Sequence, residues 1–192
     1  MTFYIGLLHY PVYNRRGEII VSAITNVDLH DLARLSETYG ARRFYVINPL
    51  EDQQDLAERI CRHWVSGYGA LYNKDRRDAM SLISIVPALD VSLAEIEQDE
   101  GEPPILLATD AGRDKGQRVA YDAARQIVSS NRAVMILFGT AWGIARELIK
   151  KADYVLEPIF GVSRYNHLSV RAAAAITLDR LFSQYSEPHR DR

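Results

Sequence analysis

Three segments in the second half of the sequence combine polar side chains with glycines directly after short apolar runs. They are TDAGRDKG after Ile105–Ala108, GTAWG after Val134–Phe138, and EPIFGVSRYNHLS after Tyr154–Leu156. If the apolar runs are parallel strands, their carboxyl ends meet at one edge of a sheet, where open α/β proteins bind ligands. The three segments therefore predict one ligand pocket.

The GTAWG segment places Gly139 and Gly143 on either side of a turn from a strand to a helix. Where a side chain is missing, backbone amides can approach a ligand closely. The alternative is a tight connection in which Thr140 caps the following helix. By itself this segment favours the second interpretation.

Other polar residues in these segments also have purely structural explanations. Asp110, at the end of a strand, is a common turn former. Asn166 and Ser169 can cap the last helix. Neither GxGxxG nor GxxxxGK[ST] follows an early strand, which argues against the common dinucleotide and phosphate-loop sites. A functional assignment therefore depends on the segments taken together.

The elements that must position these segments alternate along the chain. Short apolar runs, most of them continuous, predict strands buried on both faces, and helical patterns separate them. This order indicates an α/β fold, a mainly parallel sheet with helices on both faces. The predicted strands are 3–8, 19–24, 44–47, 82–86, 105–108, 133–138 and 154–156. The predicted helices are 29–39, 53–71, 92–98, 116–129, 144–151 and 167–185.

The last two predicted helices differ in their apolar pattern. In 144–151 the apolar residues recur on one face and the charged residues occupy the other, so one side must pack. From Leu168 to Phe182 apolar residues spread most of the way round the helix, which predicts burial on two sides and favours contact with a second subunit. The acidic segment 97–104, which ends in two prolines, separates two halves within one sheet.

The composition is that of one folded domain covering residues 1–192, with 47% hydrophobic and 25% charged residues. Cys61 is the only cysteine, which excludes an internal disulfide and a zinc cluster. We therefore expect no metal site and a reducing compartment, the cytoplasm. No apolar stretch reaches the roughly 18 residues of a membrane helix. The net charge of −2 means that RNA binding would need local basic clusters such as Lys74, Arg76 and Arg77.

The segment RHWVSGYGALYNKDRRDAM interleaves aromatic and basic side chains. They are Arg62, His63, Trp64, Tyr68, Tyr72, Lys74, Arg76 and Arg77. Such interleaving can stack bases and hold phosphates. An equally good alternative is a helix that packs Trp64 and Tyr68, four positions apart, in the core and exposes a basic end.

The succession FGTAWGIARELI, LEPIFG, YNHLSVRAAAAI and LDRL resembles the carboxyl-terminal half of SPOUT methyltransferases, the class that includes the SpoU and TrmD families. It is most similar to a small family of TrmD-like predicted RNA methyltransferases with a FGTAxG loop and a YNHLSVR segment. The resemblance is strong in the second half of the chain and loose in the first. The ordered pair of motifs carries it.

The resemblance implies an S-adenosylmethionine (SAM)-dependent methyltransferase that acts on tRNA or rRNA, with a non-catalytic RNA-binding protein of the same fold as the alternative. It also implies a deep trefoil knot within about 105–185, which pairs two subunits as a homodimer and wraps SAM in three loops. General topology rules disfavour knots, so this expectation comes from the resemblance alone. The residues that it assigns to SAM are Ala108, Thr109 and Asp110; Phe138, Gly139, Thr140 and Gly143; and Leu156, Pro158, Ile159, Gly161, Asn166, Leu168 and Ser169.

The first half contains NVDLHDLARLSETYG, which resembles the first SpoU motif through Asn26, Arg34, Tyr39 and Gly40. Arg34 lies about 140° around the helix from Leu29, so it faces away from the core. In the resemblance Asn26 and Arg34 serve catalysis, with Arg34 meeting the RNA; otherwise Arg34 is a solvated surface charge. SpoU enzymes usually carry an Asn-Glu-Gly-like second motif, whereas this chain has FGTAWG, so the acceptor atom is not identified.

Overall fold

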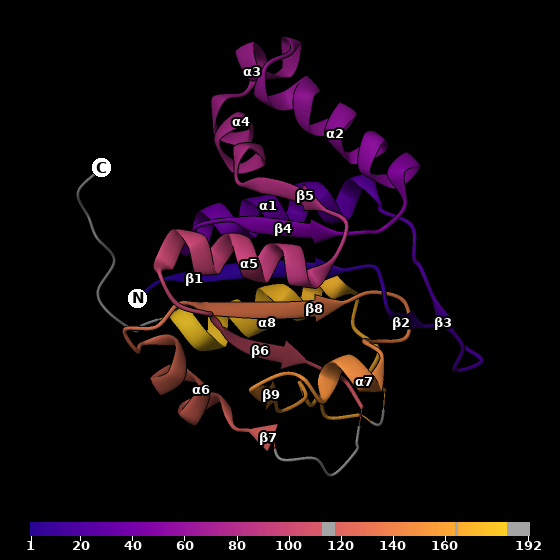
Figure 1. Cartoon of the computed structure of the whole chain (residues 1–192), viewed down its shortest axis with the longest axis vertical. Coiled ribbons are helices and arrows are strands. Elements are labelled where there is room, and N and C mark those ends of the chain that lie inside the picture. The colour runs from indigo at the N-terminus through magenta and orange to yellow at the C-terminus, as the bar shows by residue number, and fades with distance from the viewer. Residues whose placement is uncertain (113–117, 164, 184–192) are drawn as a thin grey trace.

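The computed structural model describes residues 1–112, 118–163 and 165–183, and within them a seven-stranded sheet lies between two layers of helices (Figure 1). The strand order is β5-β4-β1-β8-β6-β9-β7, and every pairing in this sheet is parallel. The strands are β1 Phe3–Leu8, β4 Phe44–Ile47, β5 Ile83–Val86, β6 Ile105–Thr109, β7 Arg118–Val119, β8 Val134–Gly139 and β9 Tyr154–Leu156. A separate antiparallel hairpin joins β2 Val12–Tyr13 to β3 Ile19–Ile20.

The helices are α1 Asn26–Tyr39, α2 Glu51–Val65, α3 Tyr68–Tyr72, α4 Lys74–Ser81, α5 Leu89–Glu100, α6 Tyr121–Val128, α7 Arg146–Ile149 and α8 Val170–Phe182. None of the described helices is long and apolar enough to cross a membrane. The fold is thus the mainly parallel α/β sheet, covered on both faces, that the sequence predicts.

Strand β1 shows why the sheet is buried on both sides. Its side chains alternate, with Phe3, Ile5 and Leu7 in one apolar layer and Tyr4 and Leu8 in the other. The first layer packs against α1, α6 and α8, and the second against α5 and α7. Continuous burial on both faces explains why the strand sequences do not alternate between apolar and polar residues.

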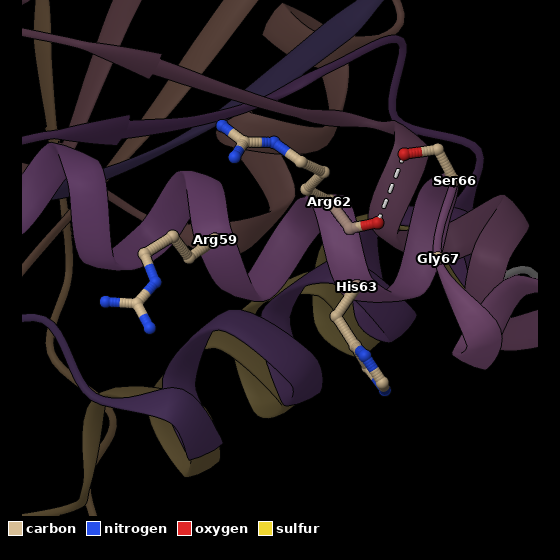
Figure 2. A pocket seen from close by; sticks show the side chains of 5 residues that line it. All are labelled: Arg59, Arg62, His63, Ser66 and Gly67. Atoms are coloured by element: carbon tan, nitrogen blue, oxygen red, sulfur yellow. Dashed lines mark hydrogen bonds between the residues drawn. The ribbon is translucent and has the colours of Figure 1, made fainter.

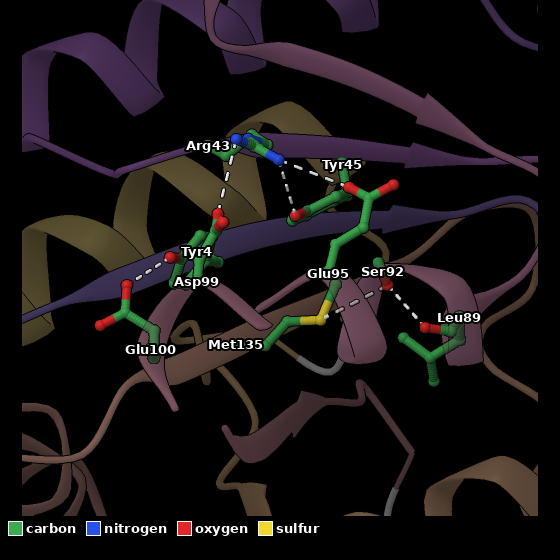
Figure 3. A network of polar contacts seen from close by, with 9 residues as sticks. All are labelled: Tyr4, Arg43, Tyr45, Leu89, Ser92, Glu95, Asp99, Glu100 and Met135. Atoms are coloured by element: carbon green, nitrogen blue, oxygen red, sulfur yellow. Dashed lines mark hydrogen bonds and ion pairs between the residues drawn. The ribbon is translucent and has the colours of Figure 1, made fainter. Parts of the chain in front are cut away.

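Polar contacts hold α5 against the sheet at the amino-terminal edge of β1 and β4 (Figure 3). The Tyr4 hydroxyl donates to Glu100 Oε1 at 2.6 Å, and Arg43 lies 3.4 Å from Glu95 and 3.5 Å from Asp99. Burial, with the Glu100 contact, raises the pKa of the Tyr4 phenol well above its ordinary value. The acidic end of α5, predicted as the boundary between two halves, is therefore tied to the first half of the same sheet.

Several predicted elements differ from the structure. The predicted strand 19–24 shrinks to β3, which pairs with the unpredicted β2 in the hairpin and stays outside the large sheet. The predicted helix 53–71 ends at Val65, and α3 and the unpredicted α4 follow it. Helix 144–151 reduces to α7, although its predicted apolar face does pack. The predicted helix 116–129 was wrong at its start, where Arg118–Val119 form strand β7 and the helix α6 begins only at Tyr121, because two residues are too short to show a strand pattern.

Helix α8 is buried on two sides by its own chain. It packs against α1 on one side and α6 on the other, with Ala174, Thr177, Leu178 and Leu181 buried. The apolar spread of this helix is thus explained without a second subunit, and a homodimer needs other support. A charge at Leu178, which is fully buried, would damage the core instead of testing assembly.

Candidate functional site

The first and second predicted loops meet at the carboxyl edge of the sheet. Thr109 Oγ1 donates to the Leu137 carbonyl oxygen at 3.0 Å, which ties the end of β6 to β8. A Cβ atom at Gly143 would lie 3.9 Å from Asp110 Oδ1. Thr109, Asp110 and Gly143 therefore lie close together, as the strand order predicts for loops at adjacent strand ends (Figure 1).

The third loop lies over the first. Asn166 Nδ2 donates to the Ala111 carbonyl oxygen at 3.0 Å. Arg118 Nη1 donates to the carbonyl oxygens of Leu156 and Asp110, each at 3.2 Å. The chain after β9 is thus held against the chain after β6, so all three predicted loops converge.

A pair that is largely shielded from solvent anchors this convergence. Arg118 Nη2 lies 2.7 Å from Asp110 Oδ2, with side-chain exposures of 16% and 24%. Asp110 Oδ1 also accepts from the Gly112 amide at 3.1 Å, so the predicted turn-forming role of Asp110 is confirmed. Sequence reasoning missed Arg118, which belongs to the short β7; residues 113–117 of the predicted first loop lie outside the described residues.

The two glycines of GTAWG are required for different reasons. A Cβ atom at Gly139 would lie 2.5 Å from Ile144 Cγ1, so a side chain there would collide with the following turn and not with a ligand. Gly143 has φ 102°, a conformation that L-residues rarely adopt, and among the described residues only Asp110 lies near its absent side chain. The close approach of Ile144 is thus a reason within the fold for glycine at position 139.

The backbone amides of the second loop are mostly used within the fold. The Thr140 amide donates to the Leu8 carbonyl at 3.2 Å, the Trp142 amide to Tyr13 at 2.9 Å, and the Gly143 amide to Thr140 at 3.0 Å. These three amides donate within the fold, as the tight connection favoured by the sequence requires. Thr140 also does not cap a helix, because α7 starts later, after Ala145.

A chain of partly buried hydroxyl and imidazole groups lies beneath this loop. Thr140 Oγ1 donates to the Leu8 carbonyl at 3.0 Å and therefore accepts from Ser22 Oγ, 2.5 Å away. Ser22 Oγ lies 3.0 Å from His9 Nδ1, and which of the two donates depends on the tautomer of the imidazole. Within the described residues Nε2 has no hydrogen-bond partner.

Sequence reasoning missed this cluster, although one signal was present. His9 and Asn48 each follow a buried strand directly, as the three predicted loops do, and both are fully buried. Asn48 Nδ2 donates to the Ser22 carbonyl oxygen at 3.1 Å. The cluster thus connects the ends of β1, β4 and β8 through the segment before α1, and it supports the second loop from below.

Burial lowers the pKa of the His9 imidazole to about 4, and the nearby Asp28 carboxylate offsets only part of this effect. The folded protein therefore keeps His9 neutral at a pH where the unfolded chain, with an ordinary pKa of about 6.5, binds a proton. The stability that this shift contributes is complete above about pH 6.5 and is lost as the pH falls toward 4. Because it has no exposed surface, His9 also does not reach an RNA acceptor.

We expect His9→Gln to remove this pH dependence. Between pH 7 and pH 5 the free energy of unfolding should fall by about 2 kcal/mol more in the wild type than in the variant, because only the wild type contains His9. Urea unfolding of both proteins at the two pH values measures the difference. An equal loss in both proteins would contradict the assigned role of His9.

The third loop has the groups that SAM would need. Leu156 is buried and Ile159 packs against the apolar core, whereas Leu168 is 46% exposed. No backbone-to-backbone hydrogen bond between described residues involves 158–168, and the Tyr165 amide donates to the Ser163 hydroxyl at 3.2 Å. An adenine ring needs an apolar slot and backbone hydrogen bonds. The residues present fit such a group.

Ser169 is the N-cap of α8 and accepts from the Ala172 amide at 3.2 Å, as its structural alternative predicts.

The two predicted catalytic residues lie on α1 but not together. Asn26 is the first residue of α1, after the cap Thr25, and this end of the helix lies near the second loop because Ser22 contacts Thr140. Arg34 is about 12 Å further along the helix axis. It is exposed, as predicted, and forms no hydrogen bond or ion pair with a described residue.

The chain matches, over residues 2–183, the family described as "SAM-dependent RNA methyltransferase". It belongs to this family. Membership confirms the predicted class of enzyme and its cofactor, SAM, and it covers the weakly resembling first half as well as the second.

Two relatives illustrate the family's range. An uncharacterised protein of Aquifex aeolicus is 40% identical over 94% of the chain and 88% of its own length. A protein of Oleidesulfovibrio alaskensis named tRNA (guanine-N(1)-)-methyltransferase is 39% identical over 94% of the chain but only 42% of its own length. The chain therefore spans less than half of that relative.

Solved structures agree on the fold. TrmJ from Z. mobilis superposes with a TM-score of 0.61 at 14% identity, covering 96% of this chain and 69% of TrmJ. The SpoU methyltransferase AviRb from Streptomyces viridochromogenes, in complex with AdoMet, has a TM-score of 0.56 at 16% identity over 94% of this chain and 56% of AviRb. This chain has the SpoU methyltransferase fold.

Proposed function

We propose that this protein methylates tRNA or rRNA with SAM held in the three converging loops. The observation that carries the proposal is the convergence itself, in which Asp110, Gly143 and Asn166 come to one edge of the sheet from three different strands. The pocket residues are those that the resemblance assigns to SAM. The O. alaskensis relative's name supports tRNA as the first substrate to test.

SAM would supply an activated methyl group, so the protein's task is to orient it and to hold the RNA acceptor. Leu156 and Ile159 would form the apolar slot, and backbone groups of the third loop that bond to no other backbone group would bind the adenine edge. Asn26 stands exposed near the loops, where its amide can hydrogen-bond the acceptor nucleotide. Arg34 would contact phosphate and stabilise charge as the methyl group is transferred.

The knot and the homodimer are parts of the same proposal. Support for the knot is that the third loop contacts the first, with Asn166 hydrogen-bonded to Ala111. Support for the dimer is the exposed apolar surface of the loop region, since Trp142, Phe160 and Tyr165 are 61%, 64% and 71% exposed. With a single cysteine, the cytoplasm remains the proposed compartment.

We expect light scattering to give twice the chain mass of 21.8 kDa. Phe160→Asp should shift this mass toward that of a monomer, because burying an unpaired carboxylate in an apolar contact is costly. Leu71→Asp, at an 89% exposed position on α3, is the matched control and should stay dimeric. A monomeric wild type at micromolar concentration would contradict the proposal.

The substrate test is transfer of a labelled methyl group from SAM to separated tRNA and rRNA fractions that lack modifications. Incorporation into one fraction identifies the substrate class. Binding of SAM and RNA without incorporation would instead establish the non-catalytic alternative.

A further inference from the structure

We propose that a groove along α2 binds an unpaired nucleotide segment of the substrate RNA; this inference rests on the proposed function. The groove consists of two adjoining hollows of about 500 and 440 Å³. Arg59 and His63 line both hollows and so form their shared wall. The groove lies outside the three cofactor loops.

The larger hollow has an apolar floor and a polar rim. Leu56, Ile60 and Trp64 supply the floor, and Asn26, Arg59 and His63 supply the rim. Hollows of this size accept one small organic group, and an apolar floor with a cation beside it suits a base and its phosphate. Because Asn26 also lines this hollow, a nucleotide there would lie next to the proposed acceptor position.

The charge on this side of α2 is free to meet an anion. Arg59 forms no hydrogen bond or ion pair with a described residue, and it projects with His63 to the same side of the helix (Figure 2). Arg62 points away from them, and its contact to Glu58, at 3.8 Å, lies between exposed groups. Arginine lines both hollows and no described carboxylate does, so a chain of net charge −2 presents here a local cationic site of the kind that RNA binding requires.

Three side chains pack around Trp64 at the floor of the groove. The Arg76 guanidinium lies 4.5 Å from the Trp64 ring centroid, and the His30 and His63 rings contact Trp64 edge-on at 5.3 and 5.1 Å. This packing accounts for the half-buried Trp64, so the core alternative for that residue is confirmed. One face of Trp64 is therefore already covered by Arg76.

The core alternative is wrong for the next aromatic residue. Tyr68 is 75% exposed and Tyr72 is 79% exposed on α3, which starts immediately after Gly67 of the smaller hollow. Exposed aromatic rings beside a basic groove can stack successive bases of a single strand. Bases within a duplex are already stacked on one another, which favours unpaired RNA over a double helix.

The test measures binding of fluorescein-labelled oligouridylate of about 12 nucleotides by anisotropy, with an RNA duplex of equal length as a second probe. Arg59→Glu should weaken oligouridylate binding by about tenfold or more, and Tyr68→Ala by about tenfold. Arg59→Ala should lower the slope of log affinity against log salt by about 0.7, the value for one lost phosphate contact. Wild type should prefer the single strand to the duplex.

Arg132→Glu is the matched control, because it makes the same charge change at an exposed position by the amino ends of the strands. It loses there only a surface ion pair with Glu102 and an exposed hydrogen bond to the Pro103 carbonyl oxygen. Equal affinity for RNA in Arg59→Glu and Arg132→Glu would overturn the groove even if the wild type methylates RNA. SAM affinity should be unchanged in both variants. If the wild-type protein itself transfers no methyl group from SAM to RNA, the proposed function fails, whatever the two variants show. A change of oligomeric mass in Arg59→Glu would make the groove a protein contact and would overturn its assignment to RNA.

Discussion

Replacing Arg34 by alanine is expected to slow methyl transfer to RNA by about a hundredfold, while SAM affinity and the free energy of unfolding stay nearly constant. The stability should hold because the Arg34 side chain is exposed and forms no ion pair with a described residue. The rate should fall because a guanidinium in a site closed by RNA stabilises charge that develops during transfer.

Two further variants separate this role from a general effect of charge. Arg34→Lys should recover only part of the rate, because an ammonium group cannot reproduce the planar fork of donors. Arg132→Ala, an exposed arginine remote from α1, should methylate at the wild-type rate. The measurement is single-turnover transfer of labelled methyl groups, and normal turnover of Arg34→Ala would make this residue a solvated surface charge.

Gly143→Val is expected to weaken SAM binding between about tenfold and a hundredfold. At φ 102° a β-branched side chain is strained, so the loop must rearrange to relieve it. The rearrangement would disturb two hydrogen bonds, from the Gly143 amide to the Thr140 carbonyl oxygen at 3.0 Å and from the Tyr13 amide to the Gly143 carbonyl oxygen at 2.9 Å. It would also move the loop relative to Asp110 of the first loop.

Gly101→Val is the control for strain alone. Gly101 ends α5 with φ 81° and has no atoms within 4 Å of its absent side chain, so the valine is strained there without touching the loops. Calorimetric titration with SAM should show wild-type affinity for Gly101→Val and reduced affinity for Gly143→Val, with both variants folded by circular dichroism. Equal SAM affinity in the two variants would separate the GTAWG loop from the cofactor.

Much of the fold could be predicted because both faces of the sheet are buried. Strands such as β8 and β9 are continuous apolar runs, and α1 begins one residue after a threonine cap whose side chain accepts from Asp28. The hairpin of β2 and β3 could not be predicted, because its two-residue strands have no period to detect. The predicted helix 53–71 is wrong around Gly67, which separates α2 from α3. A Cβ atom at Gly67 would lie 2.7 Å from the His63 carbonyl oxygen.

The candidate site shows the same division between local and distant information. The convergence of the three loops could be predicted, because each loop directly follows an apolar run that was interpreted as a parallel strand. The role of Thr140 did not follow, since its partners Leu8 and Ser22 are more than a hundred positions away in the chain. Gly139 was interpreted through a ligand, whereas the close approach of Ile144 is what excludes a side chain there.

Transfer of a labelled methyl group from SAM to RNA tests the central claim most directly, with wild type, Gly101→Val and Gly143→Val assayed side by side at low SAM concentration. We predict RNA-bound label for wild type and Gly101→Val and a large loss for Gly143→Val, recovered in part as SAM is raised. If no label reaches any tRNA or rRNA fraction with folded wild type, or if Gly143→Val matches Gly101→Val at every SAM concentration, the measurement contradicts an RNA methyltransferase with its cofactor in these loops.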